Sequence, residues 1–103
     1  MNEAKEIRAI VFKDGDHWVA QCLEYDIGAQ APDLDTLQKR LSAVLSAEFD
    51  ASVNTSGIPF GGIEPAPDFF QNLWETRSGK LTSENPSLIE AKNGISLDLA
   101  LCA

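Results

Sequence analysis

Apolar and polar residues alternate in three short runs near the start of the chain, which predicts three β-strands at residues 6–13, 17–23 and 27–31. Asp14 and Gly15 separate the first two runs, and an Asp-Gly pair favours a tight hairpin because glycine accepts the positive φ of such a turn. The first run is apolar on both faces, which indicates a strand that is covered at least partly on both sides. We expect the rest of the chain to be arranged around these strands.

A long helix is predicted to follow the three strands. Pro32 ends the third run, and Asp33 and Asp35 both offer carboxylates that can cap the N-terminus of a helix. The turn-forming residues 54–57 predict that the helix ends near Val53. Apolar side chains recur at helical spacing and form one stripe, made up of Leu34, Leu37, Leu41, Val44, Leu45 and Phe49.

A second, shorter helix is predicted after a loop. Residues 57–67 are rich in glycine and proline, which predicts a loop with at most a short extended piece at 60–64. The helix is predicted at 67–77, because Pro67 suits a first helical turn and Gly79 is a natural stop. Its apolar side is made up of Phe69, Phe70, Leu73 and Trp74. So many aromatic side chains indicate that the helix packs against another part of the protein.

The last quarter of the chain has one clear element. Residues 80–85 are predicted to form a loop, and residues 85–94 leave two structures open, a capped helical turn or one arm of a hairpin. Apolar residues then alternate with other residues over 95–102, which predicts a half-buried strand. We expect this strand to extend the edge of a sheet, either in its own subunit or in a neighbouring one.

Together these elements predict an α+β fold with a small antiparallel sheet and the helices packed on one face. A chain of 103 residues is near the usual size of one domain, so we expect a single domain over residues 1–103. Within it, residues 7–53 form a β-β-β-α core and residues 54–103 form a C-terminal extension.

The charge of the chain narrows the classes of partner. Sixteen acidic and eight basic residues give a net charge of −8. Such a domain repels phosphate backbones, so we do not expect it to bind nucleic acid. The same charge suits a basic protein partner, or simply keeps the protein soluble. No apolar run approaches the about 20 residues of a membrane span and no signal sequence leads the chain, so we expect a cytoplasmic protein without membrane contact.

The residues that could bind a metal ion are few or far apart. His17 is the only histidine, so no histidine-rich metal site can form. Asp14 and Asp16 precede the second predicted strand, whereas Glu24 and Asp26 follow it. A strand of that length spans roughly 23 Å, so the two pairs of carboxylates cannot share one ion. We therefore expect no metal site.

Other catalytic arrangements are also missing from the sequence. It contains no serine nucleophile motif of the GxSxG type and no phosphate-binding glycine loop that is followed by lysine. Cys22 and Cys102 do not make a disulfide framework, and we expect both to be buried free thiols. We therefore expect a protein that is not an enzyme and that has no catalytic residues and no cofactor.

Four stretches in residues 7–53 together suggest a family. They are IRAIVFKDGD, the aromatic-led WVAQCLEYD, the short IGAQA and the helical DLDTLQKRLSAVLSAEF. In the order of these stretches and in their local sequences, the N-terminal half resembles the HicB-like antitoxin family. The resemblance implies a β-β-β-α-β domain of partial ferredoxin-like or RNase-H-like fold. It also implies a dimer or tetramer that neutralises a small, basic, mRNA-cleaving toxin by covering it.

The C-terminal half departs from that family. Full antitoxins carry a C-terminal DNA-binding motif, whereas residues 65–103 contain three basic and five acidic residues and no recognition-helix pattern. The chain therefore resembles a HicB-like domain without the DNA-binding segment. Family members also usually carry Pro-Asp and Pro-Gly near the second connection, where this chain has LEYDIG at residues 23–28.

These observations predict a non-enzymatic, HicB-like protein-interaction domain of unspecified role, with antitoxin-like binding of a small basic protein as one form of that interaction. We expect it to form a homo-oligomer through sheet edges and aromatic surface. One alternative is a small-molecule-binding module that uses the aromatic residues of the second helix and the Gly-Pro loop. Another is a metal-dependent nuclease or hydrolase. The candidate partner-binding surface consists of His17, Trp18, Gln21 and Gln30.

Overall fold

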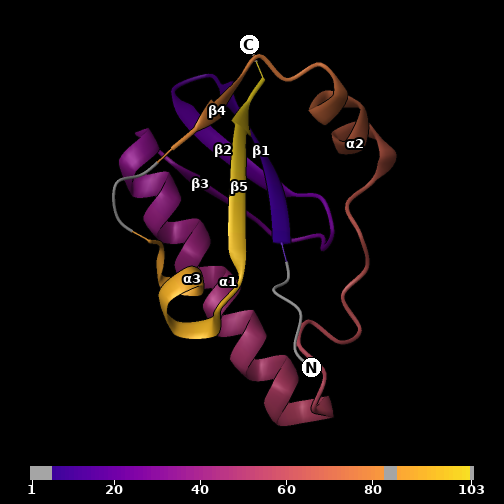
Figure 1. Ribbon diagram of the computed structural model, residues 1–103. Helices are drawn as coiled ribbons and strands as arrows, with labels where there is room; N and C mark the ends of the chain where they lie inside the picture. The colour runs from indigo at the N-terminus through magenta and orange to yellow at the C-terminus, as the bar shows by residue number, and fades with distance from the viewer. Residues whose placement is uncertain (1–5, 83–85, 103) are drawn as a thin grey trace.

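The computed structural model describes residues 6–82 and 86–102, and in it five strands form one sheet in the order β3-β2-β1-β5-β4 (Figure 1). The strands are β1 Glu6–Asp14, β2 His17–Cys22, β3 Gly28–Ala31, β4 Gly79–Leu81 and β5 Ser96–Leu101. The predicted strands at 6–13, 17–23, 27–31 and 95–102 are therefore confirmed to within one residue at either end.

The sheet is mixed, so the prediction of an antiparallel sheet is wrong. β5 pairs with β1 in parallel, whereas the other three pairings are antiparallel. The long connection through the helices brings the chain back to the same end of the sheet, and β5 therefore runs in the direction of β1. β5 also lies between β1 and β4 of its own chain, and not at the edge that we expected.

β4 occupies that edge, in a stretch where we predicted only loop. Its three residues pair antiparallel with β5, and Leu81 lies opposite Leu99. A strand this short carries too little alternation to be recognised in the sequence. Residues 83–85 of the predicted loop lie outside the described residues.

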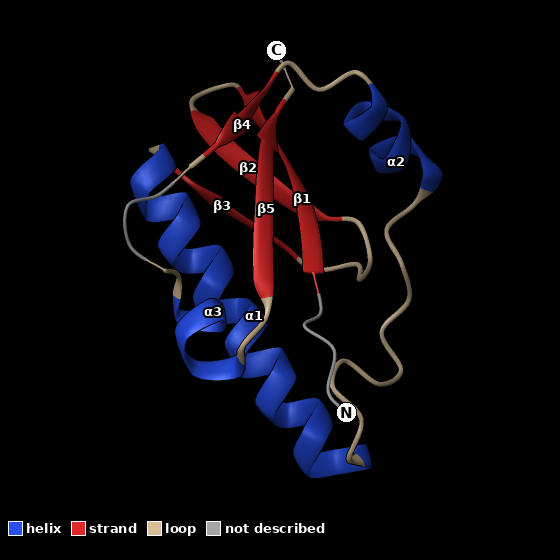
Figure 2. Cartoon of the chain, viewed as in Figure 1, coloured by secondary structure: helices blue, strands red, loops and turns tan. Residues whose placement is uncertain are grey.

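Within the described residues, three helices pack around this sheet (Figure 2). They are α1 Leu34–Ser56, α2 Asp68–Glu75 and α3 Leu88–Asn93. The side chain of Asp33 caps α1 by accepting a hydrogen bond of 2.7 Å from the backbone N–H of Thr36, as one of the two predicted caps would. α1 runs three residues beyond the predicted end, because only Gly57, with a φ of 76°, adopts the left-handed conformation that ends it.

The other two helices differ from the predictions in smaller ways. α2 is shorter than the predicted range 67–77, and Pro67 stands at its N-cap position. In the stretch that we left open, α3 forms the capped helical turn and not a hairpin arm. Ser87 and Glu90 make a capping box, and Gly94 ends the helix with a φ of 69°.

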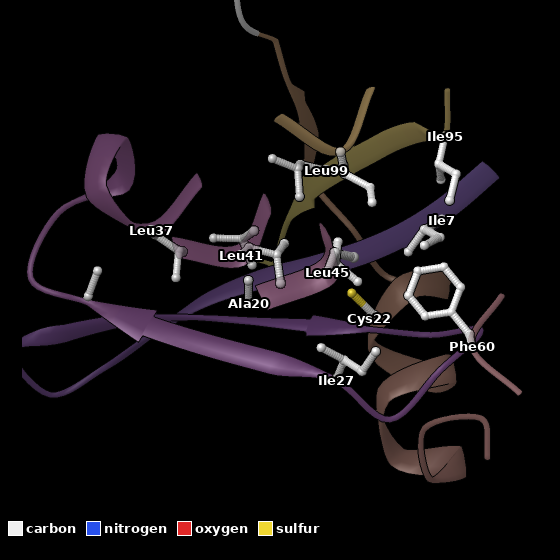
Figure 3. Close-up of a cluster of buried hydrophobic side chains, with 14 residues drawn as sticks. Ile7, Ala20, Cys22, Ile27, Leu37, Leu41, Leu45, Phe60, Ile95 and Leu99 are labelled. Atoms are coloured by element: carbon white, nitrogen blue, oxygen red, sulfur yellow. The ribbon is translucent and has the colours of Figure 1, made fainter. Parts of the chain in front are cut away.

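The helices cover both faces of the sheet, so the prediction that all of them pack on one face is wrong. Leu37, Leu41 and Leu45 of α1 pack over one face of the sheet, where Figure 3 shows them near Ala20 of β2. Trp74 of α2 packs with Ile10, which lies on the opposite face of β1. α2 can lie there because β1 is apolar on both faces. We call the face away from α1 the outer face.

The segment between α1 and α2 carries the chain from one face of the sheet to the other. Phe60 anchors it in the core beneath α1, where it is 2% exposed and stacks on Tyr25 with ring centroids 4.5 Å apart. Phe60 has a φ of 58°, an unfavourable value for a phenylalanine. Its backbone N–H donates a 2.6 Å hydrogen bond to Oγ of Ser52, which helps to hold this conformation. Further along, the N–H of Ala66 donates to the carbonyl oxygen of Leu23 at 3.0 Å, which ties the segment to the end of β2.

Among the described helices, none is both long and apolar enough to cross a bilayer.

Candidate functional site

The outer face of β2 and β3 brings together three of the four predicted partner-binding residues. His17 and Gln21 lie on this face of β2, and Gln30 lies beside them on β3, opposite Val19. His17 and Gln30 are exposed and Gln21 is half-buried. The structure therefore places these three side chains on one surface.

Trp18 lies on the other face of the sheet. Successive side chains of β2 point to opposite faces of the sheet, so Trp18 points, like Ala20, to the face that α1 covers. It pairs with Lys13 across the hairpin, and the Lys13 ammonium lies 5.5 Å from the centroid of its ring. Trp18 therefore cannot share a binding surface with the outer-face residues.

A patch of three phenylalanines borders the same outer face; the sequence suggested the two on the second helix only as part of a small-molecule pocket or of an oligomer surface, and it did not group them with Phe12. Phe70 of α2 stacks on Phe12 of β1 with ring centroids 6.3 Å apart. Phe69 meets Phe70 edge to face at 5.2 Å and is itself 63% exposed. Phe12 lies opposite Val19 in the hairpin, so the patch continues onto β2. We call Phe12, Phe69 and Phe70 the aromatic patch.

α2 leaves the outer face of β2 largely uncovered, because the helix is short and packs mainly over another part of the sheet. Trp74 of α2 packs with Ile10, Leu23 and Ala100, which belong to β1, the end of β2 and β5. The partly buried Phe70 and Leu73 extend this contact. No described helix lies over the outer side of β3. Together, the aromatic patch and the outer side of β2 and β3 form what we call the docking face.

Carboxylates surround the docking face. Asp14 lies opposite His17 at the hairpin end, and Asp16 stands in the adjoining turn. At the other end of β2, the carboxylate of Asp26 accepts a hydrogen bond of 2.9 Å from the side-chain amide of Gln21. Asp68 directly precedes Phe69 at the start of α2. These four aspartates are exposed, so the potential around the face is negative.

Two arginines on the outer side of the sheet interact with neighbouring residues. Nε of Arg8 donates to a carboxylate oxygen of Glu24 at 2.6 Å, and its guanidinium lies 5.5 Å from the Trp74 ring centroid. Arg77 lies 4.6 Å from the same centroid and donates to the backbone oxygen of Trp74 at 3.0 Å. Both guanidiniums thus help to hold α2 on the sheet.

The two cysteines lie on opposite faces of the sheet and are both free thiols, as predicted. Burial and, to a smaller extent, the nearby charge of Glu24 raise the pKa of the Cys22 thiol to about 12. A thiol with so high a pKa carries almost no thiolate at neutral pH, which makes it a poor nucleophile. Cys102 is half-buried beneath α2, so the prediction of full burial holds only for Cys22.

The four acidic residues that the sequence offered as metal ligands either bind other side chains or lie far apart. Glu24 pairs with Arg8, and Asp26 accepts from Gln21. Asp14 and Asp16 stand at the opposite end of β2. Across residues 6–82 and 86–102, no three His, Cys, Asp or Glu side chains come together in a way that could hold a metal ion.

The aromatic residues proposed for a small-molecule pocket also lie apart. Phe60 of the Gly-Pro loop packs on the α1 side of the sheet, with Tyr25 and Phe49. Phe70 and Trp74 of α2 pack on the outer face. These two groups of side chains therefore do not line one common pocket.

Comparison with known proteins leaves the family open, because no family model, no curated protein and no solved structure matches the chain. The resemblance to HicB-like antitoxins stays a prediction.

Proposed function

We propose that this protein is a non-enzymatic interaction domain that binds a basic protein partner through the docking face. The observation that carries this proposal is the exposure of Phe69. It leaves 63% of a large apolar side chain in water, directly against Phe70 and at the border of an open sheet face. Exposed aromatic residues that sit together in this way are typical of the centre of a protein–protein interface.

The energetics favour Phe69 as the main anchor. Covering an exposed phenylalanine contributes about 1.5–3 kcal/mol, which corresponds to roughly a tenfold to hundredfold change in affinity. Phe70 and Phe12 are already partly buried, so they support Phe69 from behind and keep its ring in place. The amides of Gln21 and Gln30 add hydrogen-bonding groups next to this apolar centre.

The charge around the face favours a basic partner. Four exposed aspartates lie around it, and the whole chain carries a net charge of −8. Complementary charge of this kind speeds association and selects among partners, and its effect weakens as salt is added.

Within this proposal, the partner is a small basic protein of the kind that HicB-like antitoxins cover. The order of the elements supports it, because β1, β2, β3 and α1 are followed later in the chain by β5 beside β1. That is the β-β-β-α-β order that the resemblance implies. The cytoplasmic location and the dimer or tetramer expected from the sequence stay predictions.

A pull-down from the native cell tests the proposal, with three forms of the protein as bait. These are the natural chain, Phe69→Asp and the control Ile58→Asp. Ile58 is 60% exposed and lies outside the docking face, so its replacement matches the change in exposed apolar surface. We expect a basic protein to be retained by the natural chain and by Ile58→Asp, to be lost with Phe69→Asp, and to elute at high salt. Equal retention by Phe69→Asp, or recovery of no basic protein, would contradict the proposal.

A further inference from the structure

β3 forms one edge of the sheet, and among the described residues no strand lies beyond it. The backbone N–H of Cys22 in β2 donates to the carbonyl oxygen of Ile27, directly before β3, at 2.9 Å. In an antiparallel pair, residues that bond to the neighbouring strand alternate with residues whose backbone groups point away from it. Gly28 and Gln30 stand at the alternate positions, so their N–H and C=O groups point to the open side of the edge.

One of these outward groups binds a side chain of α1. Nη1 of Arg40 donates to the carbonyl oxygen of Gln30 at 3.0 Å, which agrees with the outward direction of that carbonyl. A carbonyl oxygen accepts up to two hydrogen bonds, so this contact leaves room for another donor. The N–H groups of Gly28 and Gln30 have no hydrogen-bond acceptor among the described residues. Unpaired backbone groups in a row form a template for an extended chain.

The side of α1 above this edge has exposed apolar side chains. Ser42 and Ser46 make hydrogen bonds to residues of α3, so their side of α1 faces α3. Helical spacing turns Arg40, Val44 and Ala47 to the opposite side, and the contact of Arg40 shows that this side faces β3. Val44 is 38% exposed, and Ala47 is exposed as well. Apolar side chains of an added strand would therefore cover apolar surface on this face of the sheet.

The outer side of the edge favours basic side chains. Asp26 lies close to the start of β3 and is exposed, and the side-chain amide of Gln21 binds its carboxylate. Asp14 and Asp16 lie at the hairpin end of β2. Neither β2 nor β3 contains a lysine or an arginine. The potential along this side is therefore negative, and it attracts the side chains of lysine and arginine.

The charges on the α1 side of the edge, in contrast, are balanced. Lys39 pairs with Asp35 at 3.1 Å, and Arg40 lies near the carboxylate of Asp33. Neither sign of charge is favoured there. Successive side chains of a strand point to opposite faces, so one extended segment can be basic on the outer side and apolar on the α1 side.

We propose that β3 binds an extended segment of the basic partner as an additional strand, and that basic and apolar residues alternate in this segment. Its backbone pairs with Gly28 and Gln30, and its apolar side chains lie beside Val44. Its basic side chains lie on the outer side, near Asp26. β3 itself contains no basic residue, so a second copy of β3 does not match this segment. The inference rests on the proposed function, because the added strand extends the docking face and belongs to the same partner.

An NMR titration of the ¹⁵N-labelled full chain with a short peptide of alternating lysine and valine tests the edge without the natural partner. We expect saturable shifts centred on the amide signals of Gly28 and Gln30. A peptide with glutamate in place of lysine should have a Kd that is about fivefold higher or more, because attraction is replaced by repulsion. Of two peptides methylated on either the lysine or the valine backbone nitrogens, one should lose binding and the other keep it. Only every second N–H of a strand faces its neighbour.

Gln30→Pro tests the edge from the side of the protein. It removes an N–H that points away from β2, so the pairing of β3 with β2 should persist, and the dispersion of the amide spectrum checks this. We expect the Kd of the lysine-valine peptide to rise by about fivefold, because a backbone hydrogen bond is lost. Gln30→Ala removes the side-chain amide but keeps the N–H, so it should weaken binding less than Gln30→Pro does.

Several results would overturn the inference. They are the absence of saturable shifts at β3, shifts that centre on β4 or on the aromatic patch, and equal binding of the glutamate peptide. Shifts of Gly28 and Gln30 that depend on protein concentration without peptide would show that a second copy occupies the edge.

The pull-down separates this inference from the proposed function. Retention of the basic protein by Gln30→Pro, together with its loss with Phe69→Asp, would contradict the added strand alone. Recovery of no basic protein, together with saturable binding of the peptide at β3, would contradict the proposed function alone.

Discussion

Replacement of Trp74 by alanine tests how firmly α2 is held on the outer face. Trp74 is 7% exposed, packs with Ile10 and Leu23, and lies under the guanidiniums of Arg8 and Arg77. Large-to-small changes of a buried tryptophan cost about 3–5 kcal/mol through lost burial and the remaining cavity. A domain of this size has a free energy of unfolding of roughly 5–15 kcal/mol, so Trp74→Ala should fold but be much less stable.

Urea unfolding, followed by circular dichroism and by the fluorescence of the remaining Trp18, measures this change. We expect the midpoint for Trp74→Ala to fall by about 1.5 M or more, given an m value of about 1–2 kcal/mol/M. Phe69→Ala is the control on the same helix. Its side chain is 63% exposed and makes an edge contact with Phe70, so its loss should cost about 1 kcal/mol or less. If Trp74→Ala were no more destabilising than Phe69→Ala, α2 would not be docked on the sheet as described.

Two further predictions concern groups whose pKa is shifted. The hydrogen bond from the backbone N–H of Thr36 holds the pKa of Asp33 below its ordinary value of 3.8. The charged cap therefore stabilises α1 at pH values above 3.8, and this stabilisation is lost as the pH falls through the lowered pKa. Asp33→Asn keeps a capping oxygen but has no titrating group. Below a pH of about 4, its free energy of unfolding should therefore depend less steeply on pH than that of the natural chain. The same pH dependence in both proteins would contradict this role of Asp33. In the folded protein at neutral pH, a thiol reagent should modify Cys102, which is half-buried, and spare Cys22, whose pKa burial raises to about 12. Mass mapping of the labelled peptides checks this, and modification of Cys22 at a rate similar to that of Cys102 would show that β2 is not packed beneath α1.

The strands and the first helix could be predicted because their signals are local. Alternation fixed the extents of β1, β2 and β5, and the capping pattern at Asp33 marked the start of α1. The apolar residues on both faces of β1 also indicated that something covers the second face. The sequence did not indicate which element does so, because the packing of Trp74 on Ile10 joins residues far apart in the chain.

The direction and position of β5 were not predictable for a related reason. Its alternation is the same for a parallel and an antiparallel partner, so the pattern could not place it beside β1. β4 has three residues and begins with Gly79, too short a run to stand out from a loop. Its pairing with β5 comes from the sheet and not from its own sequence.

The alternation of side chains along β2 predicts which candidate residues share a face of the sheet, and the predicted partner-binding surface departed from it at one residue. His17 and Gln21 share one face of β2 by simple alternation, and Trp18 falls on the other face by the same rule. Placing Trp18 with the other three residues therefore went against the strand pattern. The aromatic patch could not be found in this way, because Phe12 and Phe70 meet only when α2 lies on the outer face.

Calorimetry between the purified protein and the basic protein that it retains tests the account most directly. Titrations of the natural chain, Phe69→Asp and Ile58→Asp should be run at low and high salt. The account predicts that Phe69→Asp weakens binding by about tenfold or more, that Ile58→Asp leaves the Kd unchanged, and that high salt weakens binding of the natural chain. Equal affinity of the two variants, or affinity that does not depend on salt, would contradict the claim that the docking face binds a basic partner.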